Sequence, residues 1–219
     1  SFLGVDLGAG GMKVAELQNE KGRARLVTYG FTERPPGAEP LNMVDTQKET
    51  AELLKKIVQK AKATTMRCIA GLPIASVFSA VISVPKTGEK DLKEAVLVQA
   101  KKLIPVPLEE MVIDYKEIAG IKSGMMQKAQ PKDQSKDQKD QKKKDEPKTV
   151  QVLLTGAARA MVQKYVNVFK LAGLELDSLE TETFALIRAL IGKDRATTMI
   201  VDMGAVRTNI IIVENGIPY

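Results

Sequence analysis

The chain has 219 residues, of which 44% are hydrophobic and 27% charged, and this suits a globular protein with a sizeable core in one or two domains. One cysteine and no histidine exclude a disulfide framework, the common zinc ligand sets and histidine-based catalysis. The net charge of +6 does not predict a nucleic-acid-binding fold, because nine lysines against five acids within residues 122–148 supply most of it.

The first predicted element is a hairpin with a glycine-rich turn. An apolar run over residues 2–5 enters the turn through Asp6, and a second apolar run over residues 12–17 leaves it. The turn contains three glycines, Gly8, Gly10 and Gly11. Because glycine has no Cβ, backbone N–H groups of such a turn can approach an anion closely. Asp6 at the strand end could then hold a metal ion that bridges the oxygens of the anion.

The next elements predict a mixed sheet. We expect a third strand over residues 25–32, then a helix capped by Asp45 or Thr46, then a short strand over residues 67–72. A helix and a strand that follow an antiparallel meander imply a sheet with both parallel and antiparallel pairs. Cys68 in the last strand is expected to be a small buried residue.

A strand, helix, strand, strand, helix unit follows. Its members are expected at residues 76–84, 87–103, 111–119, 149–155 and 157–172. The last two strands would pair across residues 122–148, a segment too polar to offset the entropy of ordering and therefore expected to be disordered. No apolar run approaches the roughly 20 residues that span a bilayer, so we expect no direct membrane insertion.

The first motif returns near the end of the sequence. We expect a strand or a connector at residues 174–179 and a helix at 181–190. Residues 201–205 then read Val-Asp-Met-Gly-Ala, against Val-Asp-Leu-Gly-Ala at residues 5–9. Both copies continue into an apolar strand, so the repeat predicts a duplicated lobe. Two acid-led hairpins that face each other across a cleft would hold a polyphosphate and its metal from both sides.

The candidate binding residues lie in these two hairpins. They are Asp6, Gly8, Gly10, Gly11, Lys13, Asp202, Gly204 and Thr208. The two carboxylates would bind Mg²⁺, the glycines would present N–H groups to phosphate, and Lys13 and Thr208 would donate to it. Each also has a structural interpretation: an aspartate that caps its own turn, a glycine that the turn requires, a lysine in solvent.

No catalytic residue is predicted. A phosphotransferase would need a general base near the turns, and neither Asp45, in a loop, nor Asp91, in a helix, lies beside a glycine turn. Glu182 is interpreted as an acid in the first turn of its helix, where its negative charge interacts favourably with the helix dipole. The sequence therefore favours binding over catalysis.

The two hairpins resemble those of the actin-like ATPase superfamily, with residues 181–190 as the helix that links its lobes. Within this superfamily the chain resembles the PilM family of type IV pilus assembly proteins, which is similar to the division protein FtsA. The resemblance rests on QAKKLIPVPLEE at residues 99–110, followed by Val-Ile-Asp-Tyr at residues 112–115. Three further stretches fit PilM, namely residues 13–17, 171–174 and 179–186.

The resemblance implies an α/β fold in three parts. These are an actin-like first lobe at residues 1–75 and 174–195, an FtsA-type inserted subdomain at residues 76–173 with a disordered loop at 122–148, and the start of a truncated second lobe at residues 196–219. It further implies a cytoplasmic scaffold that binds ATP and Mg²⁺ with at most weak ATPase activity. Such scaffolds bind the cytoplasmic tail of the inner-membrane protein PilN, between first lobe and inserted subdomain, and meet other inner-membrane proteins of pilus assembly.

Two features depart from the PilM pattern. PilM continues beyond the second hairpin with the rest of the second lobe and the adenine contacts, so we expect a fragment that does not bind nucleotide tightly. The first turn of this chain has Ala9, Gly10 and Gly11 where members of the family usually carry a hydroxyl residue. This difference removes one possible donor to phosphate. Two alternatives on the same fold stay open, a small-molecule kinase of the sugar-kinase type and a filament-forming protein similar to FtsA.

Overall fold

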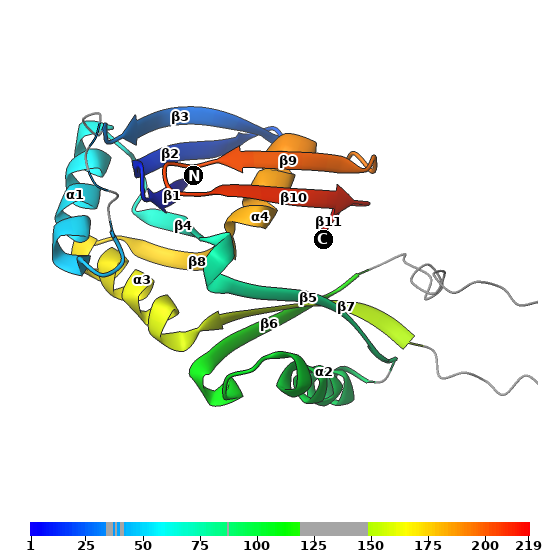
Figure 1. Cartoon of the computed structure of the whole chain (residues 1–219). Helices are drawn as coiled ribbons and strands as arrows, with labels where there is room; N and C mark the ends of the chain where they lie inside the picture. Colours follow the sequence, from blue (N-terminus) through cyan, green and yellow to red (C-terminus); the bar gives the residue numbers. More distant parts are fainter. Residues whose placement is uncertain (34–36, 38, 40–41, 87, 119–148) are drawn as a thin grey trace, which may run out of the picture. The chain divides into compact units, whose positions relative to one another are not determined.

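The computed structural model describes residues 1–33, 37, 39, 42–86, 88–118 and 149–219 (Figure 1). Residues 122–148, for which the sequence predicts disorder, lie outside the described residues. By their contacts the described residues form two compact units, one of Ser1–Val77 with Ala158–Tyr219 and the other of Phe78–Ala157.

The larger unit is built on a five-stranded sheet. Its strands are β1 (Phe2–Gly8), β2 (Gly11–Glu20), β3 (Arg23–Phe31), β4 (Arg67–Leu72) and β8 (Glu175–Thr181), in the order β3-β2-β1-β4-β8. The first three strands form the antiparallel meander, whereas β4 runs parallel to β1 and β8 runs parallel to β4. The predicted mixed sheet is therefore confirmed.

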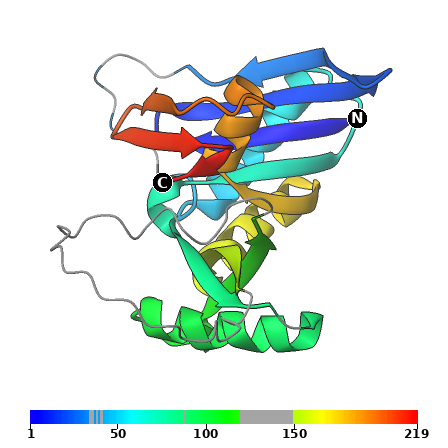
Figure 2. The same cartoon turned by 90° about the vertical axis from the view of Figure 1, so that its right-hand side faces the viewer.

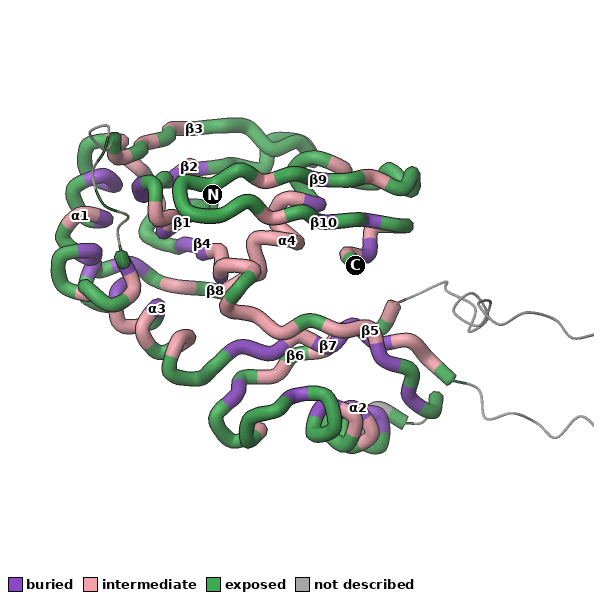
Figure 3. Tube along the Cα trace, in the orientation of Figure 1, coloured by how far each residue is buried: buried purple, intermediate pink, exposed green. Residues whose placement is uncertain are grey.

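Two helices cover the buried side chains of this sheet. Leu3, Val5 and Leu7 of β1 are buried and alternate with more exposed residues, while β3 is exposed over most of its length (Figure 3). Helix α1 (Gln47–Lys60) contacts β2 and β3, and α3 (Arg159–Ala172) contacts β8 and α1. Cys68 of β4 is fully buried, as predicted, and burial raises the pKa of its thiol to about 12.

Neither predicted cap holds the start of α1. Thr46 precedes the helix, but its hydroxyl donates to the carbonyl of Asn42 at 3.1 Å instead of accepting from the first turn. The carboxylate of Asp45 accepts from Lys164 of α3 and from the side chain of Asn42, and these contacts hold the pKa of Asp45 below its ordinary value. Asp45 therefore ties the start of α1 to α3.

One charged side chain lies inside the larger unit. Glu16 of β2 is fully buried, and its two oxygens accept from the N–H and the hydroxyl of Thr64 at 2.7 and 2.5 Å. Burial raises the pKa of this carboxyl, but the bonds from Thr64 favour the charged form and leave the pKa of Glu16 below its ordinary value. The pair joins β2 to the segment that precedes β4.

The second hairpin forms a small sheet of its own within the larger unit. Its strands are β9 (Thr198–Met203), β10 (Thr208–Glu214) and β11 (Ile217–Pro218). One face packs on a helix made of α4 (Glu182–Leu186) and a π-helical turn (Ile187–Ile191). That helix begins as predicted, because the hydroxyl of Thr181 accepts from the N–H of Phe184. The other face exposes Met199, Val201, Met203, Ile210 and Ile212.

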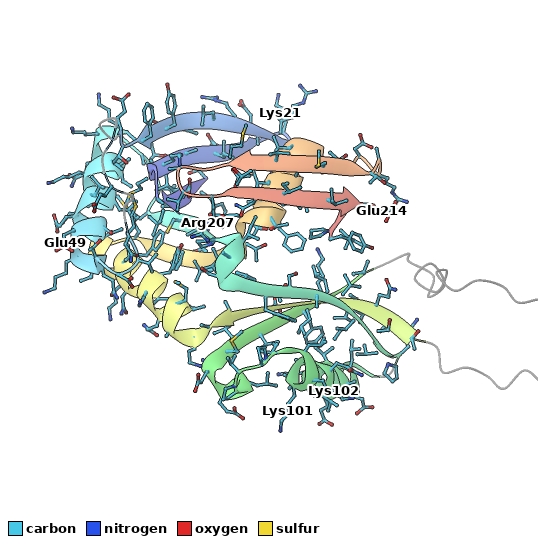
Figure 4. All side chains as sticks on the ribbon, viewed as in Figure 1. Lys21, Glu49, Lys101, Lys102, Arg207 and Glu214 are labelled. Atoms are coloured by element: carbon cyan, nitrogen blue, oxygen red, sulfur yellow. The ribbon has the colours of Figure 1, made fainter. Side chains whose placement is uncertain are left out.

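The smaller unit is a three-stranded sheet with a helix on one face (Figure 2). Its elements are β5 (Val77–Pro85), α2 (Glu89–Leu103), β6 (Met111–Glu117) and β7 (Thr149–Ala158), with a 3₁₀ turn at Leu108–Glu110 before β6. The 3₁₀ turn at Ile74–Ser76, just before β5, belongs to the larger unit. The order β5-β7-β6 confirms that the strands on either side of residues 122–148 pair with each other. Val84, Val96 and Leu154 are fully buried in its core, and Lys101 and Lys102 of α2 are exposed (Figure 4).

The smaller unit ends earlier than the predicted insert of residues 76–173. Helix α3 was expected to belong to the insert, but it packs on α1 and β8 and therefore belongs to the larger unit. Val168 and Phe169 of α3 are fully buried, whereas Val166 is exposed. The assignment of residues 196–219 to a second lobe stays a prediction.

Candidate functional site

The first candidate turn joins β1 to β2. The strands pair as far as Gly8 and Gly11, so that Asp6 and Lys13 lie directly opposite each other. The Nζ of Lys13 is 2.9 Å from Oδ2 of Asp6 and 3.3 Å from the carbonyl oxygen of Gly11, to both of which it donates. Both side chains are about half exposed, so the ion pair stands at the surface beside the turn.

Each glycine of this turn has a steric reason. A Cβ on Gly8 would lie 3.3 Å from both Oδ2 of Asp6 and Nζ of Lys13, so glycine here leaves room for the ion pair. Gly11 has a φ of +141°, and a Cβ there would lie 2.6 Å from the carbonyl oxygen of Thr32. These constraints hold whether or not the turn binds an anion, and the phosphate-binding role of the glycines stays a prediction.

The second candidate turn joins β9 to β10. Asp202 and Asn209 lie opposite each other, and the Nδ2 of Asn209 donates to Oδ2 of Asp202 at 3.1 Å. The N–H of Gly204 donates to the carbonyl of Arg207 at 2.9 Å, which closes the turn. Thr208 begins β10 and is exposed. Figure 4 shows Arg207 in this turn.

The fold brings the two turns together. A Cβ on Gly10 would lie 2.9 Å from the Cβ of Ala205, closer than such atoms pack, so only glycine allows this approach. These residues are separated by almost the whole length of the sequence, yet their turns touch. The two acid-led turns therefore meet in the larger unit. That they hold a polyphosphate across a cleft stays a prediction.

Two further charged residues, Glu182 and Arg207, interact with the two turns, and neither was predicted as a site residue. Glu182, the first residue of α4, accepts from the N–H of Ile74 at 3.3 Å. Burial raises the pKa of Glu182, the charges of Asp6 and Asp202 raise it further, and the charge of Arg207 opposes them. Glu182 thus lies within the electrostatic reach of both turns. Arg207 could have been predicted as a site residue from its position in the second turn, between Gly204 and Thr208.

Helix α3 contributes a buried phenol to the same region. Tyr165 is 1% exposed, and burial raises the pKa of its hydroxyl, as do the charges of Glu182 and Asp6. The site therefore collects side chains from β1, β2, α3, α4 and the β9–β10 hairpin.

The two turns offer the kinds of side chain that a metal ion bound together with an anionic ligand would need. Within the described part of the chain, no group of three or more His, Cys, Asp or Glu side chains is placed to hold a metal ion. Mg²⁺, however, keeps several waters and binds through one or two carboxylates plus the phosphates of a substrate. Asp6 and Asp202 would supply those carboxylates, and Lys13 and Arg207 would supply positive charge for the phosphates.

A sequence profile described as "Type IV pilus assembly protein PilM" matches residues 4–130, more than half of the chain. The chain belongs to the PilM family. The predicted resemblance to this family is therefore confirmed, and the mixed α/β domain shares its fold with a solved PilM structure. In the described ranges of this PilM-family chain, none of the helices is both long and apolar enough to cross a membrane.

Solved structures agree on the fold. A PilM–PilN type IV pilus biogenesis complex matches the whole chain with a TM-score of 0.76 at 23% identity. The cytoplasmic domain of EpsL, an inner-membrane component of the type II secretion system of Vibrio cholerae, matches 98% of the chain with a TM-score of 0.55 at 12% identity. The chain spans 59% of the matched chain in the first structure and 68% in the second.

Proposed function

We propose that this chain is an ATP-binding scaffold of type IV pilus assembly. The observation that supports nucleotide binding is the approach of the two acid-led turns at Gly10 and Ala205. Their carboxylates are those that the sequence analysis proposed as Mg²⁺ ligands, and Lys13 and Arg207 add positive charge at the same place. Membership of the PilM family supports the role in pilus assembly.

Each side chain has a distinct part in this proposal. The Nζ of Lys13 would bind a phosphate oxygen in place of Asp6, and the backbone of Gly10 and Gly11 would line the phosphate. Asp6 and Asp202, one from each turn, would hold Mg²⁺. Thr208 adds a hydroxyl donor at the second turn. No side chain is assigned to catalysis, and ATP serves as a bound ligand.

The expected result is that Asp6→Asn and Asp202→Asn each weaken Mg²⁺–ATP binding about tenfold or more, because a neutral amide replaces a ligand of the metal. Isothermal titration of the folded protein with ATP measures this, with and without Mg²⁺. Asp114→Asn is the matched control, since Asp114 belongs to the smaller unit and its carboxylate accepts from the N–H of the neighbouring Tyr115. Equal affinity in all four proteins would contradict the metal role.

We further propose a partner, the cytoplasmic N-terminal tail of a PilN-like inner-membrane protein. A structure with this fold is that of a PilM–PilN complex, which supports the partner's class. The scaffold would then be cytoplasmic and held at the inner membrane by this tail, near the other inner-membrane proteins of pilus assembly. In this proposal the smaller unit would be the FtsA-type insert, and the larger unit would contain the actin-like first lobe and part of a second lobe.

The partner proposal is tested with a synthetic peptide. We expect the first residues of the PilN-like protein of the same organism to bind the folded chain, with heat released in calorimetry. A peptide of the same composition in scrambled order is the control. If the chain is folded by circular dichroism and neither peptide gives heat, the scaffold proposal fails in its main part.

A further inference from the structure

Thr32 makes two hydrogen bonds to the same residue, at the point where β3 ends. Its N–H donates to the carbonyl of Met12 at 2.9 Å, and its hydroxyl accepts from the N–H of Met12 at 2.8 Å. The ladder between β2 and β3 reaches Lys13 and Phe31, so Thr32 adds a final rung with a side-chain oxygen in place of the backbone carbonyl.

The side-chain bond leaves the backbone carbonyl of Thr32 free to lie over the first turn. That carbonyl oxygen would be 2.6 Å from a Cβ on Gly11, and the hydroxyl oxygen would be 2.9 Å from it. Gly11 has its φ of +141° at this place. The carbonyl oxygen and the hydroxyl oxygen of Thr32 thus limit the space that is available to the backbone of Gly11.

Met12, the residue after Gly11, is held by the hydroxyl of Thr32. Met12 has no exposed surface, so its N–H has no access to water and depends on the hydroxyl of Thr32. Lys13 follows Met12 directly, and the register of β1 and β2 places it opposite Asp6, its partner in the ion pair. A change in the peptide between Gly11 and Met12 therefore moves the charged pair as well as the turn.

We infer that Thr32 is a positioning residue, which holds the β1–β2 turn in the conformation that binds an anion. This inference rests on the proposed nucleotide site. Thr32 itself contacts neither phosphate nor metal in this account. It acts through Gly11, Met12 and Lys13, by the hydrogen bond that its hydroxyl accepts from the N–H of Met12.

The first test measures the mobility of the turn without ligand. We expect Thr32→Val to speed amide exchange of Gly11 and Met12 about tenfold or more, and Thr32→Ser to restore the slow exchange. Thr28→Val is the matched control on the same strand, because the hydroxyl of Thr28 donates to the carbonyl of Ala61 and not to the turn. Equal exchange in Thr32→Val and the native chain, or equal acceleration by Thr28→Val, would overturn the inference.

The second test measures Mg²⁺–ATP affinity in the same four proteins. We expect a dissociation constant about tenfold higher for Thr32→Val and near-native values for Thr32→Ser and Thr28→Val. If the native chain binds ATP and Thr32→Val binds equally well, Thr32 has no positioning role and the proposed function stands. If the folded native chain binds no nucleotide, the proposed function fails, and the ligand role of Thr32 falls with it whatever the exchange data show.

Discussion

Replacing Gly11 by alanine is expected to lower the free energy of unfolding by about 3 kcal/mol. Two costs add at this position. The φ of +141° is one that a residue with a Cβ rarely adopts, and the new Cβ would lie 2.6 Å from the carbonyl oxygen of Thr32. Because that oxygen belongs to the backbone at the end of β3, it cannot move aside without breaking the bonds between Thr32 and Met12.

Gly22→Ala separates these two costs. Gly22 has a φ of +82° in the turn between β2 and β3, but no atom lies within 4 Å of a Cβ there. Its replacement should therefore cost only about 1 kcal/mol, from backbone conformation alone. Urea unfolding followed by circular dichroism measures both variants against the native chain. Similar losses in the two variants would show that the contact with Thr32 carries no energy.

Replacing Glu16 by alanine is also expected to cost about 3 kcal/mol at neutral pH. The change removes two hydrogen bonds, leaves the N–H of Thr64 without its acceptor, and opens a cavity in a fully buried place. Glu20→Ala is the control on the same strand. Glu20 is exposed and pairs with Arg25 at 3.2 Å, so its loss should cost less than about 1 kcal/mol.

The cost of losing Glu16 should depend on pH in a predictable direction. The folded pKa of this carboxyl is lowered below its ordinary value of 4.5, so its charge stabilises the fold above that pH. This stabilisation is lost as the pH falls below about 4.5 and through the lower folded pKa. The gap in stability between the native chain and Glu16→Ala should therefore narrow on acidification. A gap that stays constant from about pH 7 to about pH 3 would contradict the role of the charged form.

Local patterns were sufficient to predict most of the elements. The strand at residues 67–72 has the predicted bounds, and the helix predicted at residues 87–103 ends at Leu103 as expected. The prolines that follow at positions 105 and 107 explain this end, because neither can continue the hydrogen-bond ladder. The repeated Val-Asp-x-Gly-Ala motif also predicted two similar hairpins, and it needed no knowledge of how the chain folds between them.

Contacts between distant residues could not be predicted in this way. Periodicity shows that α3 has an apolar face, but not that α1 and β8 cover it. The steric role of Gly10 depends on Ala205, and the buried charge of Glu16 depends on Thr64. Nothing in the sequence near these residues names their partners.

The ion pair between Lys13 and Asp6 means that the first turn carries its own counterion. In the proposed site, a phosphate would exchange one partner of Lys13 for another, and Mg²⁺ would take the place of Lys13 at Asp6. Part of the Coulomb energy gained on binding would therefore replace energy that the ion pair already supplies. Nucleotide without metal would leave Asp6 unpaired beside the phosphate, so metal and nucleotide would bind this turn as a couple and each would bind weakly alone.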